Sequence, residues 1–249
     1  MPDLPDVTDL PDLRALHHAD TPLVLANVWD PGTAKLVAAA GFPAVATSSA
    51  AVAEANGYSD HEEMPADVAF AAVRAIAQAV PDVPVTADME SGYGLPPAEF
   101  ATRLVEAGAK GCNYEDTDHA NPGTLLAPEF QAERIAAIRA AQPDLVINAR
   151  VDTFLTGDKD PDDALRRARL YVDAGADCVY PIILSDEALI ARFVEEVDAP
   201  VNILLFPHSP PLARLVELGV RRISVGSGLF RRAIKTFTDG LEDLKLSGG

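Results

Sequence analysis

Short apolar runs alternate with longer amphipathic stretches along most of the chain. The apolar runs end near Asp30, Ser49, Glu90, Asp116, Asp152, Leu184, Phe206 and Ser227. Between them lie stretches such as PADVAFAAVRAIAQAV (65–80) and PDDALRRARLYVDAG (161–175), in which apolar residues recur at helical spacing. Several stretches open with Pro and Asp or Glu, residues typical of the first turn of a helix. The pattern therefore predicts eight strands that alternate with helices.

Four similar segments support this alternation: LVAAAGFPAV (36–45), LVEAGAKGCN (104–113), YVDAGADCVY (171–180) and LVELGVRRIS (215–224). Each is interpreted as the last turn of a helix, a glycine that ends it, and a short strand. Gly41, Gly108 and Gly175 are each 67 residues apart, which fits two helix–strand units of ordinary size. Eight such units in 249 residues predict an α/β fold of the (β/α)₈ TIM-barrel type. The alternative is a doubly wound open sheet, but no GxGxxG motif follows the first strand.

We expect one domain over residues 1–249, with residues 1–20 as a leading segment. In that segment His17 and His18 are interpreted as surface residues. The stretch LFRRAIKTFTDGLEDL (229–244) predicts a last amphipathic helix that covers the barrel. The N-terminus lacks the basic and apolar regions of a signal peptide, and the most apolar tract (36–53) is interrupted by Pro43, which argues against a membrane span. A cytoplasmic protein is the expectation.

Charge and cysteine content narrow the possible partners. The net charge of −18 argues against nucleic acid or an anionic membrane surface as a partner, because both require a basic surface. Cys112 and Cys178 are far apart and form no CxxC pattern, so the sequence indicates neither a disulfide framework nor a zinc site. Both are interpreted as small buried residues. A small-molecule substrate remains compatible with the acidic composition.

Carboxylates gather at the predicted strand ends, where TIM barrels place their catalytic groups. In VTADMESGYG (85–94), Asp88 and Glu90 are two residues apart on a strand and so point to the same side. Glu115 ends the next strand, and Asp60 lies in the loop after the second. Carboxylates that converge on one cavity raise each other's pKa unless a cation binds. Oxygen ligands of this kind indicate Mg²⁺, whereas zinc would require His or Cys.

Other polar residues lie near the same strand ends. Arg150 is the only cation among the predicted inward positions, and His208 after the seventh strand is a candidate acid or base. Asp116 and Asp152 are interpreted as supporting groups. In the loop after the fourth strand, His119 and Asn121 belong either to a mobile lid or to a plain surface loop.

The motifs also resemble a known family. SS (48–49), GYSD (57–60), ADMESGYG (87–94), NYEDT (113–117) and INARVDTF (147–154) together resemble the isocitrate lyase and phosphoenolpyruvate mutase superfamily, over roughly residues 27–229. The resemblance implies a Mg²⁺-dependent barrel that acts on small 2-oxo acids or related 2-hydroxy acids. It implies that four carboxylates hold the ion: those of Asp60, Asp88, Glu90 and Glu115. It implies that the substrate carboxylate binds the backbone amides of Ser48, Ser49 and Ala50, and that Arg150 pairs with substrate oxygens. By the same resemblance, Asn121 is a possible remnant of a substrate-binding segment. It also implies a homo-oligomer, a tetramer or a dimer.

The loop after the fourth strand departs from the better-known relatives. The lyases carry a Lys-Lys-Cys-Gly-His segment there, whereas this chain has DTDHANPGTLLAPEF (116–130), which contains neither Cys nor Lys. We therefore expect cleavage of a C–C or P–C bond of a small 2-oxo acid through a metal-stabilised enolate, with oxaloacetate decarboxylation or hydrolysis preferred. Three alternatives stay open: a catalytically weak relative that binds a 2-oxo acid, a methylisocitrate-lyase-like or phosphonopyruvate-processing enzyme, and an aldol-type condensation.

Overall fold

The computed structural model describes residues 11–156 and 159–245. Its β-segments are β1 (Leu23–Leu25), β2 (Asn27–Val28), β3 (Val45–Thr47), β4 (Val85–Asp88), β5 (Gly111–Glu115), β6 (Val146–Val151), β7 (Cys178–Pro181), β8 (Asn202–Leu204) and β9 (Arg222–Ser224). Only Ala26 separates β1 from β2, so the two form one barrel strand in two pieces. Counted in this way, the described residues contain the eight strands that the sequence predicts.

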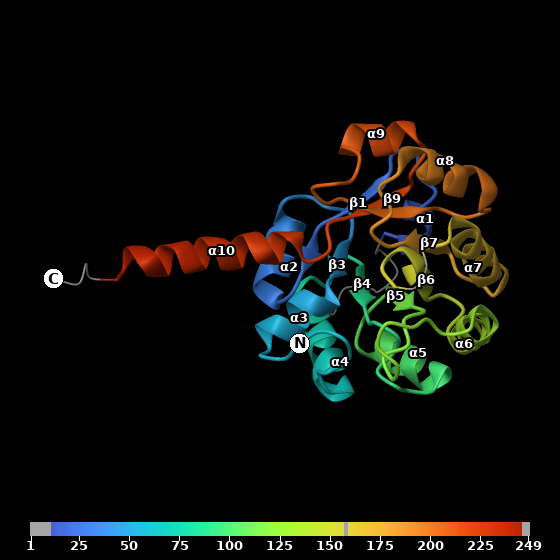
Figure 1. Cartoon of the computed structure of the whole chain (residues 1–249). Coiled ribbons are helices and arrows are strands. Elements are labelled where there is room, and N and C mark those ends of the chain that lie inside the picture. The colour runs from blue at the N-terminus through green and yellow to red at the C-terminus, as the bar shows by residue number, and fades with distance from the viewer. Residues whose placement is uncertain (1–10, 157–158, 246–249) are drawn as a thin grey trace.

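All strand pairs are parallel and close into a barrel. One series runs β2-β3-β4-β5-β6-β7, and the other runs β1-β9-β8. A bridge between Val179 and Val201 joins β7 to the start of β8, and the split first strand joins the two series at the other end. The predicted (β/α)₈ barrel is confirmed (Figure 1).

Helices surround the barrel, most of them between consecutive strands (Figure 1). They are α1 (Leu13–Leu16), α2 (Pro31–Ala39), α3 (Ser49–Ala55), α4 (Ala66–Ala79), α5 (Pro97–Glu106), α6 (Pro128–Ala141), α7 (Pro161–Asp173), α8 (Glu187–Glu196), α9 (Leu212–Glu217) and α10 (Gly228–Asp243), with a 3₁₀ turn, η2, at Asp152–Phe154. Proline in the first turn and side-chain caps begin several of them: Asp30 and Thr33 form a reciprocal capping box at α2. The predicted link between N-terminal Pro and Asp and helix starts therefore holds at α2 and α7.

The repeated glycines end helices as predicted. Gly108, with φ +94°, follows α5, and Gly175, with φ +107°, follows α7. An added Cβ would lie 2.9 Å from the Ala77 side chain at Gly108 and 3.0 Å from Arg139 at Gly175. Both positions therefore require glycine for conformation and for space.

The floor of the barrel holds a charged group. Arg222 on β9 is buried and donates to Asn113 Oδ1 at 3.0 Å, and its Nη1 lies 3.2 Å from His17 Nε2. His17 is only 1% exposed, so its expected place on the surface is wrong. The residue reaches the floor because α1 folds under the barrel, where burial and Arg222 lower the pKa of His17 to about 4. Cys112 and Cys178 are buried and free, as the sequence indicates.

The final helix departs from the prediction. The helix α10 extends away from the barrel instead of covering it (Figure 1). Ile234, Phe237 and Leu241 are exposed along it, and Phe237 is 67% exposed. Residues 1–10 of the predicted leading segment lie outside the described residues. In the two described ranges, no helix is long and apolar enough to cross a membrane.

Candidate active site and metal centre

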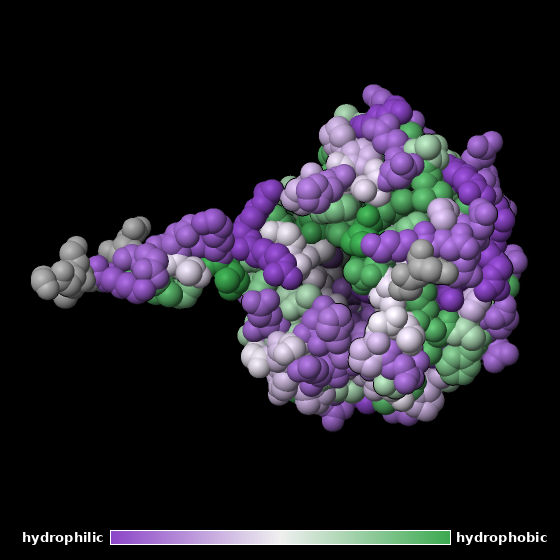
Figure 2. Space-filling model, viewed as in Figure 1, coloured by the Kyte–Doolittle hydropathy of each residue, from purple (hydrophilic) through white to green (hydrophobic). Residues whose placement is uncertain are grey.

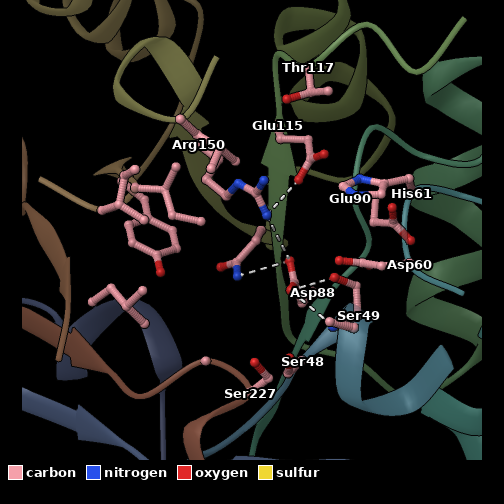
Figure 3. Close-up of a pocket in the computed structure, with 18 of the residues that line it drawn as sticks. Ser48, Ser49, Asp60, His61, Asp88, Glu90, Glu115, Thr117, Arg150 and Ser227 are labelled. Carbon is pink, nitrogen blue, oxygen red and sulfur yellow. Dashed lines mark hydrogen bonds and ion pairs between the residues drawn. The ribbon is translucent and has the colours of Figure 1, made fainter. Parts of the chain in front are cut away.

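A cavity of about 910 Å³ opens at the carboxyl ends of the strands. Its lining includes most of the residues that the sequence singles out: Ser48, Ser49, Ala50, Asp60, Asp88, Glu90, Glu115 and Arg150. Figure 3 shows side chains from separate strands and loops pointing toward this one space. The predicted convergence of the strand ends is therefore present in the fold, although their roles in binding stay predictions.

Asp88 is held at the end of β4 by neighbours on both sides. Its Oδ2 accepts from the backbone N–H and from the hydroxyl of Ser49, at 3.0 and 2.9 Å. Its Oδ1 accepts from Asn113 Nδ2 at 3.2 Å. Asn113 is itself oriented, because its Oδ1 accepts from Asn148 and from Arg222. The carboxylate thus has a fixed orientation at the cavity floor (Figure 3).

Glu90 is positioned by the turn that follows β4. Its backbone is left-handed, with φ +49°, which is uncommon for a residue other than glycine. Its Oε2 accepts from the backbone N–H of Glu62 at 2.7 Å, and its Oε1 accepts from the Tyr93 hydroxyl at 3.1 Å. Strained backbone of this kind concentrates at functional sites.

Arg150 on β6 is enclosed by acids. Asp152 accepts from its Nε at 2.8 Å and from its Nη2 at 2.6 Å, while Glu115 Oε2 lies 2.6 Å from its Nη1. Asp116 in turn accepts from the backbone N–H of Asp152 at 2.9 Å and from Tyr171 at 2.6 Å. Asp116 and Asp152 therefore support Arg150, as the sequence suggests, and do not face the cavity themselves.

The site carries more negative charge than its cations neutralise. Burial, followed by Asp60, Glu115 and Asp88, raises the pKa of Glu90 to about 8. Burial also holds the pKa of Glu115 well above its usual range, against the opposing effect of Arg150. Asp60 Oδ1 is buried without a hydrogen-bond partner. An orphaned carboxylate oxygen beside three other carboxylates fits a divalent cation, and an oxygen-only donor set of this kind suits Mg²⁺.

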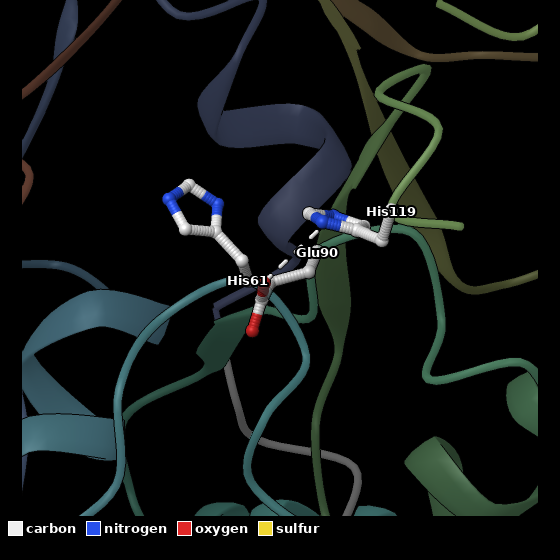
Figure 4. Close-up of side chains that lie close together, drawn as sticks. All are labelled: His61, Glu90 and His119. Atoms are coloured by element: carbon white, nitrogen blue, oxygen red, sulfur yellow. Dashed lines mark ion pairs between the residues drawn. The ribbon is translucent and has the colours of Figure 1, made fainter. Parts of the chain in front are cut away.

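Two imidazoles adjoin this group, and the sequence-based prediction did not count them as ligands. His119 Nε2 lies 2.7 Å from Glu115 Oε1 and 3.8 Å from Glu90 Oε2. In the described part of the chain, donor atoms of His61, Glu90 and His119 all lie within 4.8 Å of one another (Figure 4). A ligand set of imidazole and carboxylate suits a transition metal, whereas carboxylates alone suit Mg²⁺. A signal was present in the sequence, since His61 directly follows Asp60 and His119 follows Glu115 by four residues.

The amides predicted to bind the substrate carboxylate are partly engaged. Ser48 caps α3 and its N–H donates to Val28 O at 3.3 Å, while the N–H of Ser49 donates to Asp88. Ala50 also lines the cavity. Two of the three predicted donors therefore serve the protein itself in this conformation.

Two predicted residues lie away from the cavity. Asn121 is exposed in the β5–α6 loop, where its Nδ2 donates to Asp118 Oδ2 at 2.9 Å. His208 is exposed in the turn after β8, because Ser209 N–H donates to Phe206 O and directs the intervening residues outward. The structure brings neither of them to the lining, so their roles stay predictions to which the cavity lining adds no support.

Comparison with known proteins agrees with this geometry. The sequence profile of the family described as phosphoenolpyruvate phosphomutase matches residues 13–245. The chain belongs to the phosphoenolpyruvate mutase and isocitrate lyase superfamily. A solved structure from Burkholderia cenocepacia is 41% identical, with a TM-score of 0.86 and coverage of 92% of this chain and 97% of the other.

Two named relatives of this superfamily differ in reaction. The chain is 30% identical over 254 residues to the phosphoenolpyruvate phosphomutase of Streptomyces hygroscopicus, covering 95% of this chain and 80% of the relative. It is also 30% identical over 208 residues to the 2-methylisocitrate lyase of Bacillus subtilis, covering 79% and 68%. A mutase and a lyase thus share the same percentage identity with this chain, and membership supports an enzyme of this general type without fixing the bond that it breaks.

Proposed function

We propose that this protein is a divalent-cation-dependent enzyme that cleaves a C–C bond of a small 2-oxo acid, or of a 2-hydroxy acid that yields one. The observation that carries the proposal is the convergence of Asp60, Asp88, Glu90 and Glu115 beside Arg150 at the barrel mouth. Such a set has little use without a cation and an anionic ligand, because its members oppose each other's ionisation. Mg²⁺ suits oxygen donors of this kind when some of them act through water, because it keeps several waters in its coordination shell.

Some residues of the site would hold the ion, and Arg150 would neutralise negative charge on the substrate. Asp60, Asp88, Glu90 and Glu115 would hold the ion, directly or through water. When bound, the ion supplies Lewis-acid charge beside the substrate's oxygens. Arg150 presents Nη1 toward the cavity, 3.9 Å from Asp88 Oδ1, and adds positive charge where an enolate oxygen develops. Asp152 fixes the plane of the guanidinium through two hydrogen bonds, so that its orientation is set before substrate arrives.

The proton donor differs from the cysteine of the better-known lyases. Both cysteines are fully buried on β5 and β7, and burial raises the pKa of each thiol to about 12. Neither cysteine lines the cavity. A reaction that needs no thiol, such as decarboxylation or hydrolysis of oxaloacetate, is therefore preferred over cleavage of isocitrate by the cysteine route.

A proton NMR time course tests the proposal. Purified protein with Mg²⁺ is incubated with oxaloacetate, phosphonopyruvate, methylisocitrate, isocitrate and substituted malates, and EDTA-treated protein serves as the control. Metal-dependent loss of one compound identifies the bond that is broken. Loss of phosphonopyruvate alone would contradict C–C cleavage, and loss that persists in EDTA would contradict the role of the cation.

One observation favours a second candidate function, a protein that binds a 2-oxo acid without converting it. Arg150 is engaged by Asp152 and Glu115, and the amides of Ser48 and Ser49 are engaged too. Ligand-dependent thermal stabilisation without turnover of any compound in the same panel would select this function.

We also propose a homo-oligomer in which α10 packs on a second copy. Successive strands are followed by helices on the barrel wall, but no helix after β9 covers the wall between α9 and α2 in the described residues (Figure 1). Leu36 on α2 is 70% exposed, and Leu212 and Val216 on α9 are also exposed. The exposed apolar side chains of α10 would match this uncovered wall on a partner.

A further inference from the structure

Two imidazoles line the cavity from loops that follow different strands. His61 lies in the loop between α3 and α4, and His119 lies in the loop between β5 and α6. Their ring centroids are 5.9 Å apart, and the buried side chain of Glu90 lies beside both (Figure 4). His61 is exposed, and Figure 2 shows a hollow near the centre of the molecule with hydrophilic residues along part of its edge. The group is therefore accessible to an ion from solvent.

The donor atoms of these three residues are close enough to share one ion. His119 Nε2 lies 3.8 Å from Glu90 Oε2, and all three donor atoms lie within 4.8 Å of one another. Bonds of about 2.1 Å from a metal ion to nitrogen or oxygen place two ligand atoms about 3.0–4.2 Å apart, depending on the angle between them. A closure of less than about 1 Å therefore completes the site. Because His61 is exposed on a loop, rotation of its side chain suffices for that closure.

The neighbours of this group orient it and leave it free to bind. His119 Nε2 lies 2.7 Å from Glu115 Oε1, a contact that keeps the imidazole over the carboxylates. Glu90 Oε2 accepts from the backbone N–H of Glu62 at 2.7 Å. A carboxylate oxygen has two lone pairs, so this hydrogen bond leaves one of them for an ion. Imidazole nitrogen combined with carboxylate oxygen favours Zn²⁺, Co²⁺ or a similar ion over Mg²⁺.

The charge of the cavity also matches a second divalent ion. The four carboxylates of the proposed function all line this cavity. Arg150 and Asp152 beside them carry opposite charges, 2.6 Å apart, and offset each other. One Mg²⁺ offsets two of the four negative charges, and a second divalent ion would offset the other two.

We infer that His61, Glu90 and His119 form a second metal site, which binds a transition-metal ion such as Zn²⁺ beside the Mg²⁺ of the proposed function. The inference goes beyond that function and uses it only for the neighbouring ion, with Glu90 between the two. Asp88 is not part of the second site, since other neighbours fix its oxygens at the cavity floor. Three protein ligands leave a four-coordinate ion one open position, which is free for water or a substrate oxygen.

Titration with Co²⁺, a spectroscopic probe for such a site, tests the inference. The EDTA-treated full chain is titrated with Co²⁺ alone and in excess Mg²⁺, by calorimetry and by visible absorption. We expect two equivalents without Mg²⁺ and one in its excess, because Mg²⁺ competes poorly for imidazole. A single equivalent that Mg²⁺ displaces overturns the second site and leaves the proposed function intact. A single equivalent that Mg²⁺ does not affect supports the histidine site and contradicts the proposed Mg²⁺ site.

Histidine variants assign the ligands. His61→Asn and His119→Gln should each weaken Co²⁺ binding in excess Mg²⁺ by more than about 100-fold, because each variant removes a nitrogen ligand. Asparagine tolerates the φ of +71° at position 61, so the loop keeps its conformation. The matched control is His18→Gln, an exposed histidine after α1, which should leave Co²⁺ affinity unchanged. Unchanged affinity in both His61→Asn and His119→Gln overturns the inference.

Discussion

Glu90 lies where burial and three neighbouring carboxylates act on one group. Its pKa of about 8 lies above the ordinary 4.5 of a glutamate, so the folded chain keeps a proton that the unfolded chain releases between these two values. Stability is therefore highest below about pH 4.5 for this group and falls as the pH rises toward 8. Glu115 acts in the same direction, because its pKa is also raised.

The prediction is that the melting temperature in EDTA falls between pH 5 and pH 8, and that Mg²⁺ reduces this slope by binding the ionised carboxylates. Glu90→Gln, which removes the charge, should raise the melting temperature at pH 8 in EDTA by about 2–4 °C, the shift for about 1 kcal/mol in a chain of this size. Differential scanning fluorimetry across the pH range measures it. A wild-type profile that is flat in EDTA would contradict the buried, protonated state.

Asp88 provides a direct test of the ion. Asp88→Asn keeps the shape and the contacts with Ser49 while it removes the charge. We expect Mg²⁺ affinity, measured by calorimetry, to fall by more than about 100-fold, which exceeds the usual effect of groups that only support a ligand. The control is Asp82→Asn, an exposed residue before β4. Unchanged affinity in Asp88→Asn would remove Asp88 from the metal site.

Sequence patterns identified the acids of the site better than their partners. Asp88, Glu90, Glu115 and Arg150 were predictable because strand ends in a parallel barrel must meet at one edge. The engagement of the Ser49 amide by Asp88 was not, since it depends on where α3 begins relative to β4. The outward position of His208 was not predictable either, because it depends on the conformation of the turn after β8, which strand periodicity does not encode.

At the scale of secondary-structure elements, two loops are joined across the cavity rim by one side chain. Glu62 lies in the loop between α3 and α4, and its Oε1 accepts three hydrogen bonds from the turn after β4. The donors are the backbone N–H of Ser91 at 3.1 Å, the hydroxyl of Ser91 at 2.8 Å and the backbone N–H of Tyr93 at 2.6 Å. Both His61 and Glu62 have positive φ, so the loop is held in a strained conformation. This contact fixes Asp60 and His61 over the site.

We predict that Glu62→Ala weakens Mg²⁺ binding by about tenfold, because Asp60 loses its fixed position, and lowers the free energy of unfolding by about 1–3 kcal/mol, because buried donors lose their acceptor. Calorimetry and urea denaturation measure the two effects. The matched control is Glu54→Ala, an exposed glutamate on α3. A variant that is destabilised but binds Mg²⁺ normally would show that the two loops do not position the ion.

Elements were predictable where periodicity and caps agree, and uncertain where tertiary contacts decide. The amphipathic pattern of α7, its Pro161 and the glycine after it all indicate one helix, and the structure confirms it. The loop between β5 and α6 carries Pro122 and Gly123 with no period, so only the spacing of His119 four residues after Glu115 indicated that its side chain turns inward.

At the scale of the whole molecule, the sequence pattern of the final helix does not determine which surface its apolar face packs against. The stretch 229–244 has the period of an amphipathic helix, and that period predicts an apolar face without naming what covers it. Phe230 is buried against Trp29, with ring centroids 5.1 Å apart, whereas the apolar residues further along α10 are exposed. The helix is thus anchored at its first turn and directed away from its own barrel.

Spacing along α10 makes the partner surface testable. Ile234, Phe237 and Leu241 recur three and four residues apart and so share one side of the helix, whereas Lys235 lies on the opposite side and pairs with Asp239. If that side packs on a second copy, Phe237→Glu buries a charge in the interface and should convert the oligomer to a monomer, while Lys235→Glu should not. Light scattering after size exclusion measures the mass of each. A wild-type monomer at all concentrations would contradict the interface, and a Phe237→Glu oligomer would place it elsewhere.

Retained Mg²⁺ binding in the monomer would further show that each barrel builds its own metal site, since Asp60, Asp88, Glu90 and Glu115 all come from one chain.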